Sequence, residues 1–233
     1  MEIKVVASSS KGNCYIVDDG ASKLIIECGI PWLQILDALN YKTADVCGCL
    51  ISHSHGDHSK AITEVMRNGI EVYTSAECLE ELGDKINAHH RANRISDYEF
   101  TVGSYKVRPF AVEHDVTNLA FLIKSTVTNE TLLFVTDTNQ IPYAVNGLDY
   151  LICECNFDRK TLFANIDSGL VDEKLALRII KNHMEFETIK TYIEHIDRRN
   201  LKQIYLIHLS NQNINQSYVV KEIQKLTGCE VII

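Results

Sequence analysis

Short runs of apolar, often β-branched residues alternate with turns along the first half of the chain. Runs of this kind predict strands at 3–8, 14–19 and 23–28, with a hairpin turn at Asp19-Gly20 between the last two. Apolar residues spaced three and four apart predict a helix over 32–39. The rest of this half predicts, in order, a strand at 47–52, a helix at 61–68 capped by Ser59, a strand at 71–75 and a helix at 76–82.

The second half begins with strands and ends with helices. Apolar runs predict strands at 98–102, 105–112, 119–126, 130–137 and 149–155. Helical periodicity appears at 173–183, 187–196 and 217–226, with strands at 203–208 and 230–233. Because strands precede helices in both halves, we expect an αββα sandwich of the α/β class, with two mixed β-sheets and helices on the outer faces. No repeat or Pro/Gly/Ser-rich linker interrupts the chain, so residues 1–233 are expected to form a single domain.

Composition places the chain among ordinary globular proteins. Apolar residues make up 45% and charged residues 23% of the 233 positions. No apolar run is long enough to span a bilayer, and the N-terminal MEIKVVASSS lacks the layout of a signal peptide. We therefore expect a cytoplasmic protein without a membrane partner. The eight cysteines include the pairs Cys47/Cys49 and Cys153/Cys155, whose i,i+2 spacing on predicted strands favours buried, reduced thiols.

The net charge of −8 bears on the kind of substrate. A protein that grips long nucleic acid over its whole surface is usually basic. The excess of acidic residues argues against binding along an extended nucleic-acid backbone and favours a short or small phosphate ester as substrate. It does not exclude nucleic acid, because bound dications would add local positive charge.

The segment from His53 to His58 is the most informative in the chain. It holds four potential metal ligands, His53, His55, Asp57 and His58, between an apolar strand and a helix. Two residues apart, His53 and His55 can converge on one metal, while Asp57 and His58 can turn towards a second around Gly56. Imidazole suits zinc and similar ions, and a carboxylate suits a harder or shared position.

Three further candidate ligands end apolar runs. His114 follows the strand RPFAV, Asp137 ends TLLFVT, and His208 ends QIYLI. Each alone could be a satisfied core or surface residue. All three lie at the ends of predicted strands, where side chains can extend from the core to a shared edge. Together they could complete a two-metal site.

The H-x-H-x-D-H pattern of this loop resembles the hallmark of the metallo-β-lactamase superfamily, whose fold is an αββα sandwich. The resemblance implies that one ion is held by His53, His55 and His114, and a second by Asp57, His58 and His208, with Asp137 bridging them. The implied cofactors are two divalent ions, Zn²⁺ with Mn²⁺ as the alternative. Where the family has an early aspartate, this chain has Glu27, a position that supports the loop and does not ligate metal.

Within the superfamily the chain resembles the YycJ or WalJ branch of phosphodiesterases, which is linked to DNA exonuclease activity. The matching segments are Ser8–Cys14 (SSSKGNC), Glu154-Cys155-Asn156, His183-Met184, where that branch has His-Leu-Ser, and His208-Leu209-Ser210 with Asn213. The chain has no room for the insertion of β-CASP nucleases. Homodimers are common in the superfamily, so a homodimer is a possible assembly.

A mechanism follows from this site. Two cations about 3.5–4 Å apart would activate a bridging water as hydroxide and clamp a phosphoryl oxygen. Asp57 and Asp137 would hold the metals and orient that hydroxide. His183 is the candidate proton donor to the leaving alkoxide, with Glu154 orienting it, a pairing similar to that of transfer-RNA maturation enzymes. Alternatively, His183 only interacts with a helix C-terminus. Ser210 and Asn213 could bind substrate phosphate or cap a turn.

The leading hypothesis is a binuclear phosphodiesterase acting on nucleic acid or nucleotides, in the manner of an exonuclease. A cyclic nucleotide phosphodiesterase is the first alternative, because compact phage-encoded members of this superfamily destroy cyclic nucleotide defence signals. A lactone or thioester hydrolase is the second, since such enzymes share the same ligands. A degenerate binding module is the last, and the intact ligand set argues against it.

Overall fold

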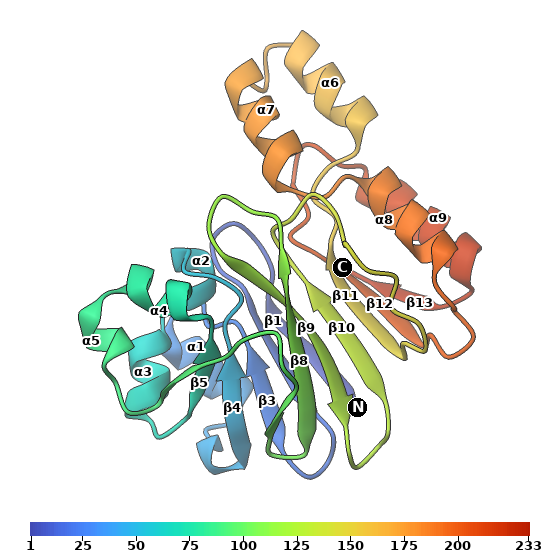
Figure 1. Cartoon of the computed structure of the whole chain (residues 1–233). Coiled ribbons are helices and arrows are strands. Elements are labelled where there is room, and N and C mark those ends of the chain that lie inside the picture. Colours follow the sequence, from blue (N-terminus) through green and yellow to red (C-terminus); the bar gives the residue numbers. More distant parts are fainter. The chain divides into compact units, whose positions relative to one another are not determined.

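The apolar runs of the first half form a six-stranded sheet in the order β1-β2-β3-β4-β5-β6 (Figure 1). Its strands are β1 (Glu2–Ala7), β2 (Cys14–Asp18), β3 (Lys23–Ile26), β4 (Val46–Leu50), β5 (Val72–Thr74) and β6 (Ala92–Arg94). The first three strands pair antiparallel, and β3 to β6 pair parallel. Because β3, β4 and β5 run parallel, the loops that follow them all lie at the same edge of the sheet.

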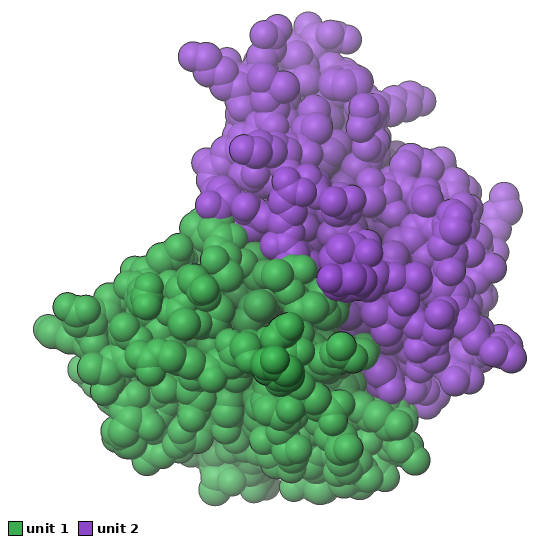
Figure 2. Space-filling model, viewed as in Figure 1, with its two compact units in different colours: residues 1–111, 116–130 green, residues 112–115, 131–233 purple.

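The computed structural model describes residues 1–233 and divides into two compact units (Figure 2). Unit 1 comprises 1–111 and 116–130, and unit 2 comprises 112–115 and 131–233. The prediction of a single domain over 1–233 stays a prediction. No helix in the structure is long and apolar enough to cross a membrane.

Helices cover one face of the six-stranded sheet. They are α1 (Trp32–Ala38), α2 (Gly56–Ser59), α3 (Ile62–Arg67), α4 (Ala76–Leu82) and α5 (Asp84–Asn87), with the short 3-10 helix η1 (Thr43–Asp45) before β4. Ile25 and Cys49 of the sheet belong to the same buried cluster as Ile35 and Val65 of the helices. Burial of this apolar face is the main stabilising contribution of the layer. The prediction that Ser59 caps the helix at 61–68 was wrong: Ser59 ends α2, and its hydroxyl donates back to the carbonyls of Ser54 and His55.

The second sheet packs on the opposite face within unit 1. Its strands there are β7 (Phe100–Val102), β8 (Tyr105–Val112) and β9 (Asn118–Ser125), in the order β9-β8-β7. The sheets approach closely at Gly48 of β4, because a Cβ atom there would lie 2.8 Å from Val102 and from the Tyr73 ring. The hydroxyl of Tyr105 donates to the carbonyl of Ser22 at 2.9 Å, which ties the two sheets together.

Unit 2 carries the parallel part of the second sheet, in the order β13-β12-β11-β10. Its strands are β10 (Thr131–Val135), β11 (Tyr150–Glu154), β12 (Gln203–Ile207) and β13 (Glu230–Ile232). Its helices are α6 (Arg159–Asp167), α7 (Glu173–Asn182), α8 (Phe186–His195) and α9 (Gln216–Thr227). The helices α8 and α9 contact each other, and α9 contacts β13. In Figure 1, α6 and α7 lie side by side as a hairpin with its own small core, made by Phe157, Leu162, Val171 and Ala176.

The fold class is confirmed: two mixed sheets with helices beside them form the αββα arrangement. The burial expected for the cysteine pairs is also largely confirmed. Cys49, Cys153 and Cys155 are buried, and Cys47 is partly buried.

Candidate metal centre

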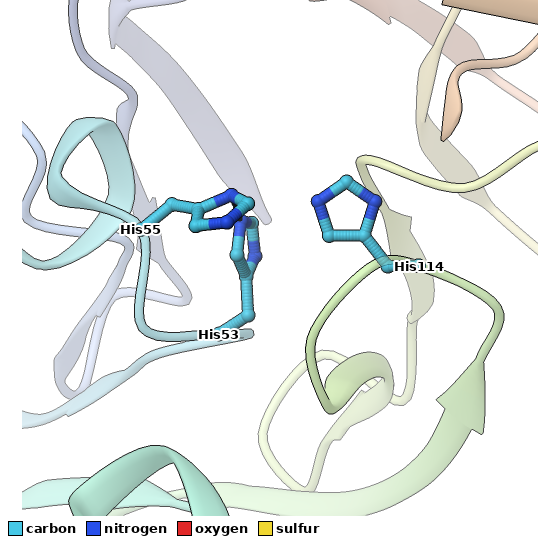
Figure 3. A group of neighbouring side chains, drawn as sticks. All are labelled: His53, His55 and His114. Carbon is cyan, nitrogen blue, oxygen red and sulfur yellow. Dashed lines mark hydrogen bonds between the residues drawn. The ribbon is translucent and has the colours of Figure 1, made fainter. Parts of the chain in front are cut away.

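The loop after β4 brings two imidazole nitrogens together. His53 is buried, and its Nδ1 lies 2.9 Å from the Ser52 hydroxyl, so its Nε2 is directed at His55. Nε2 of His53 and Nδ1 of His55 are 3.1 Å apart, and Figure 3 shows the two rings edge to face. Two nitrogens bound to one tetrahedral zinc lie about 3.3 Å apart. This pair therefore has the spacing of two ligands of a single ion.

The next turn of the loop presents a second donor pair. Asp57 and His58 lie on the short helix α2, where Nε2 of His58 is 3.4 Å from a carboxylate oxygen of Asp57. The Asn13 amide nitrogen lies 3.1 Å from the same Nε2. This nitrogen and oxygen also have the separation that two ligands of one divalent ion require.

Glu27 lies behind this second pair. Its carboxylate is fully buried, accepts from the backbone N–H of Ser52 at 3.2 Å, and lies 3.5 Å from Nδ1 of His58. Burial raises the pKa of Glu27, in spite of the opposing effect of His58. Its backbone is in the left-handed region, with φ of 62°. Glu27 thus contacts both ends of the ligand loop, as expected for a supporting residue.

The parallel strands of unit 2 collect four polar side chains at one edge. Asp137 follows β10, Glu154 ends β11, and His208 follows β12. The register pairs Val135 with Cys153 and Glu154 with Ile207, so the carboxyl ends of these strands are level. His183 joins them from the end of α7, and each of the four contributes one donor atom within 4.8 Å of the others.

Glu154 is the centre of this cluster. One oxygen, Oε1, lies 2.6 Å from Nδ1 of His183 and 2.8 Å from Nδ1 of His208. The other accepts from the backbone N–H groups of Thr138 and Met184 at 3.2 and 3.4 Å. Burial opposes ionisation of Glu154, but His183 and His208 outweigh it and lower the pKa of this carboxyl.

The hydrogen bonds of Glu154 determine which nitrogens of His183 and His208 remain available to other groups. Because Nδ1 of His208 bonds to Glu154, Nε2 is the atom through which this ring could ligate a metal, an arrangement common in carboxylate–histidine–metal sites. For His183, burial favours the neutral ring, but the charge and hydrogen bond of Glu154 raise its pKa. Asp137 lies 3.4 Å from Nδ1 of both histidines and accepts from the Thr136 hydroxyl.

Asp137 and His208 adopt strained backbone conformations. Their φ angles are 49° and 53°, in the left-handed region that residues other than glycine rarely adopt. Such a residue costs on the order of 1–3 kcal/mol and persists only where its surroundings enforce it. Strain at two strand ends in one cluster is typical of a functional site.

The remaining predicted residues have different surroundings. His114 lies on the loop after β8 (Figure 3), with Nε2 3.0 Å from Asp115 and its ring centroid 6.4 Å from that of His183. The Ser210 hydroxyl accepts from the N–H of Asn213, and the Asn213 side chain accepts from Asn165 at 2.9 Å. Both contacts stabilise the loop after β12, so a substrate role for Ser210 and Asn213 stays a prediction.

Sequence reasoning gave no role to Asn13 or Asn156, which both hold site residues. Asn13 contacts His58, and the Asn156 amide donates to the carbonyl of His208 at 2.9 Å. Both lie in matched segments, SSSKGNC and Glu154-Cys155-Asn156, and that position was the available signal. The contact between Glu154 and His208 had no local signal, because 54 positions separate the two residues.

Comparison with known proteins decides the family. The model of the β-lactamase superfamily domain matches residues 23–209, which is most of the chain. The chain belongs to the metallo-β-lactamase superfamily. The match includes all seven predicted metal ligands.

Curated relatives confirm the predicted branch. The chain is 25% identical over 224 residues to the exodeoxyribonuclease WalJ of Streptococcus pneumoniae, covering 84% of this chain and 81% of the relative. It is 27% identical over 180 residues to the exodeoxyribonuclease YycJ of Bacillus anthracis, covering 70% and 65%. Among solved structures, the metallo-β-lactamase fold protein YhfI of Bacillus subtilis matches with a TM-score of 0.73 at 20% identity, over 99% of this chain and 95% of that one. This superfamily member is a metal-dependent hydrolase.

Proposed function

We propose that this chain is a binuclear phosphodiesterase that hydrolyses nucleic acid or nucleotide phosphodiesters, in the manner of an exonuclease. The observation that carries the proposal is the Glu154 carboxylate bound to both His183 and His208. A proton donor fixed beside a proposed metal ligand suits the expulsion of the alkoxide that leaves when a phosphodiester is hydrolysed. The names of the WalJ and YycJ relatives support the same substrate class.

The donor set fits two divalent ions, with zinc the proposed metal and manganese the alternative. One ion would be held by His53, His55 and His114, and the other by Asp57, His58 and His208, with Asp137 shared. The 3.1 Å separation of the His53 and His55 nitrogens and the 3.4 Å separation between His58 and Asp57 support this division. Imidazole and carboxylate donors are those that zinc prefers in hydrolytic sites.

Bound divalent ions supply hydroxide at neutral pH and polarise a phosphoryl oxygen. The protein's own residues do the rest. Glu154 holds Nδ1 of His183, so that Nε2 can deliver a proton to the leaving alkoxide. The negative charge of Glu154 keeps this ring protonated to higher pH than a free histidine, which matches the role of an acid. Asp57 and Asp137 would hold the ions and orient the attacking oxygen.

A substrate panel tests this function. Purified protein of measured metal content is assayed with bis-p-nitrophenyl phosphate, single- and double-stranded oligonucleotides, a 3′,5′-cyclic mononucleotide and a lactone. We expect turnover of the dye ester and of oligonucleotide ends, lost in Asp57→Ala without loss of folding. Turnover of the cyclic nucleotide alone would select the first alternative, which the net charge of −8 favours. Turnover of the lactone alone would overturn the proposal.

A further inference from the structure

Unit 2 contains a groove lined by the first turns of three helices. Its volume is about 690 Å³, within the range of pockets that hold small ligands. The N-terminal residues of α6, α8 and α9 form its walls. The residues that matter most for its chemistry are Arg159, Lys160, Asn165, Phe186, Asn215 and Tyr218.

The segments that line the groove follow closely, along the chain, three of the polar residues at the sheet edge of this unit. Asp158 comes after Glu154, Glu185 after His183, and Asn215 after His208. Asn165 donates to Asn213 at 2.9 Å and to the carbonyl of Gln212 at 2.8 Å, which ties α6 to the loop after β12. Ligands of parallel sheets bind outside the carboxyl ends of the strands, and two of the lining segments, at Asp158 and Asn215, follow the carboxyl ends of β11 and β12.

An aromatic platform stands in the groove. Tyr218 is 48% exposed, and the buried Phe186 ring supports it edge to face, with centroids 5.8 Å apart and planes at 70°. Asn215 caps α9 by accepting from the N–H of Tyr218, so the backbone below the ring is also fixed. An exposed, rigid tyrosine of this kind can stack on a nucleobase whatever its sequence.

A guanidinium is fixed in the lining as well. Arg159 donates from Nε and Nη2 to the Glu185 carboxylate at 3.0 and 2.7 Å, while its side chain remains 56% exposed. Those bonds leave Nη1 available to a phosphate oxygen, and Lys160 is its exposed neighbour.

The acidic groups of the lining all have partners within the protein. The Asp158 oxygens accept from the N–H groups of Thr161 and Asn215, and Glu185 is paired with Arg159. Glu187 is exposed, with Lys190 at 3.9 Å. The lining carries two basic side chains, Arg159 and Lys160, and three acidic ones, so its formal charge is −1 in a chain of net charge −8. A polyanion therefore meets less repulsion here than the whole-chain charge suggests.

We propose that this stacking groove (Arg159, Lys160, Phe186 and Tyr218) holds the single strand of a nucleic-acid substrate next to the scissile phosphodiester. One base stacks on Tyr218, and an adjoining phosphate accepts from Arg159. The inference rests on the proposed function and assigns to it a polynucleotide in place of a mononucleotide. It also explains how an acidic protein binds a single strand, because stacking on the bases replaces most of the attraction between basic side chains and the phosphates.

The test compares Tyr218→Ala with the conservative Tyr218→Trp and with Tyr98→Ala, which removes a 77% exposed tyrosine of unit 1. Anisotropy measures the binding of a fluorescent single-stranded hexanucleotide to each protein without turnover. We expect binding to weaken about ten-fold in Tyr218→Ala, to recover in Tyr218→Trp and to be unaffected in Tyr98→Ala. The ratio of kcat/KM for the hexanucleotide to that for bis-p-nitrophenyl phosphate should fall by a similar factor only in Tyr218→Ala.

Two outcomes separate the proposals. If Tyr218→Ala binds the hexanucleotide as well as wild type does, the groove assignment is overturned, whatever the enzyme hydrolyses. If binding depends on Tyr218 but no phosphodiester is cleaved, the proposed catalytic function fails and the groove remains a binding site. Circular dichroism and thermal unfolding of each variant confirm that the fold is retained.

Discussion

Glu154 and His208 share a buried hydrogen bond of 2.8 Å between Oε1 and Nδ1, at the level carboxyl ends of β11 and β12. The same oxygen lies 2.6 Å from Nδ1 of His183. A single carboxylate thus orients a proposed metal ligand and the proposed proton donor. Removal of the Glu154 carboxylate should therefore weaken both metal binding and catalysis, whereas removal of a residue with one of these roles should weaken only that one.

Glu154→Gln should lower metal affinity or activity by about 10–100-fold, because the amide keeps the shape but removes the charge that fixes both imidazoles. Zinc content after dialysis and kcat for the dye ester measure the two effects. Glu194→Gln, an exposed change on α8, is the matched control and should behave like wild type. Full metal content and full activity in Glu154→Gln would contradict the assigned role.

His183→Ala should reveal proton donation through its dependence on the leaving group. A general acid contributes about 10²–10⁴-fold when the leaving alkoxide needs a proton. Nitrophenolate leaves without one, so the variant should lose far more activity on oligonucleotides than on bis-p-nitrophenyl phosphate. Metal content should stay unchanged. An equal loss on both substrates would show that His183 acts in another way.

Removal of metal should destabilise the protein as well as inactivate it. A ligand at 100 times its dissociation constant stabilises the folded state by about 2.7 kcal/mol, so chelation should lower Tm. Asp57→Ala should lack activity and show a smaller chelator-dependent shift, since it has lost one donor. Addition of zinc or manganese to stripped wild type should restore turnover and identify the preferred ion. If the chelator changes neither Tm nor turnover, the metal assignment fails.

Asp19 should make folding stability fall at low pH. Asp19 is only 6% exposed. Burial opposes ionisation of its carboxyl, but the hydroxyls of Ser104 and Ser125, at 2.6 and 2.7 Å, and the backbone N–H groups of the turn lower its pKa. A lowered folded-state pKa gives stability that is present above the unfolded value of about 3.9 and lost as pH falls through the folded value.

Asp19→Asn should therefore lower the free energy of unfolding by about 1–3 kcal/mol at pH 7, with a smaller difference below pH ~4. Urea unfolding at several pH values measures both. The exposed Asp37→Asn serves as the control. A difference that stays constant from pH 7 to pH 3 would contradict the assigned pH dependence.

Sequence patterns predicted those parts of the fold in which burial determines structure. The apolar runs that form β2, β3, β11 and β12 are almost wholly buried. A continuous apolar run of about four to eight residues is typical of a buried strand, so the sequence pattern was sufficient. The helix α6 was missed because Leu162 is its only buried residue, so no apolar stripe marks it. The strand β6 was missed because its three residues are partly buried or exposed.

The candidate site likewise has a part that the sequence predicted and a part that it did not. The cluster His53–His58 is local, so spacing alone indicated which donors would pair. The edge formed by Asp137, Glu154 and His208 was only partly predictable: the strand ends were visible, but the parallel register that levels them is a tertiary property. The stacking groove had no signal, because its lining comes from three separate helix starts.

The left-handed backbone at Asp137 and His208 has an evolutionary consequence. Asparagine and glycine tolerate that conformation better than aspartate and histidine do. A library selected only for thermal stability should therefore enrich asparagine or glycine at 137 and 208, and the selected proteins would lack two of the proposed metal donors. Robustness and activity oppose each other at these two positions, so engineering for longevity must leave both fixed.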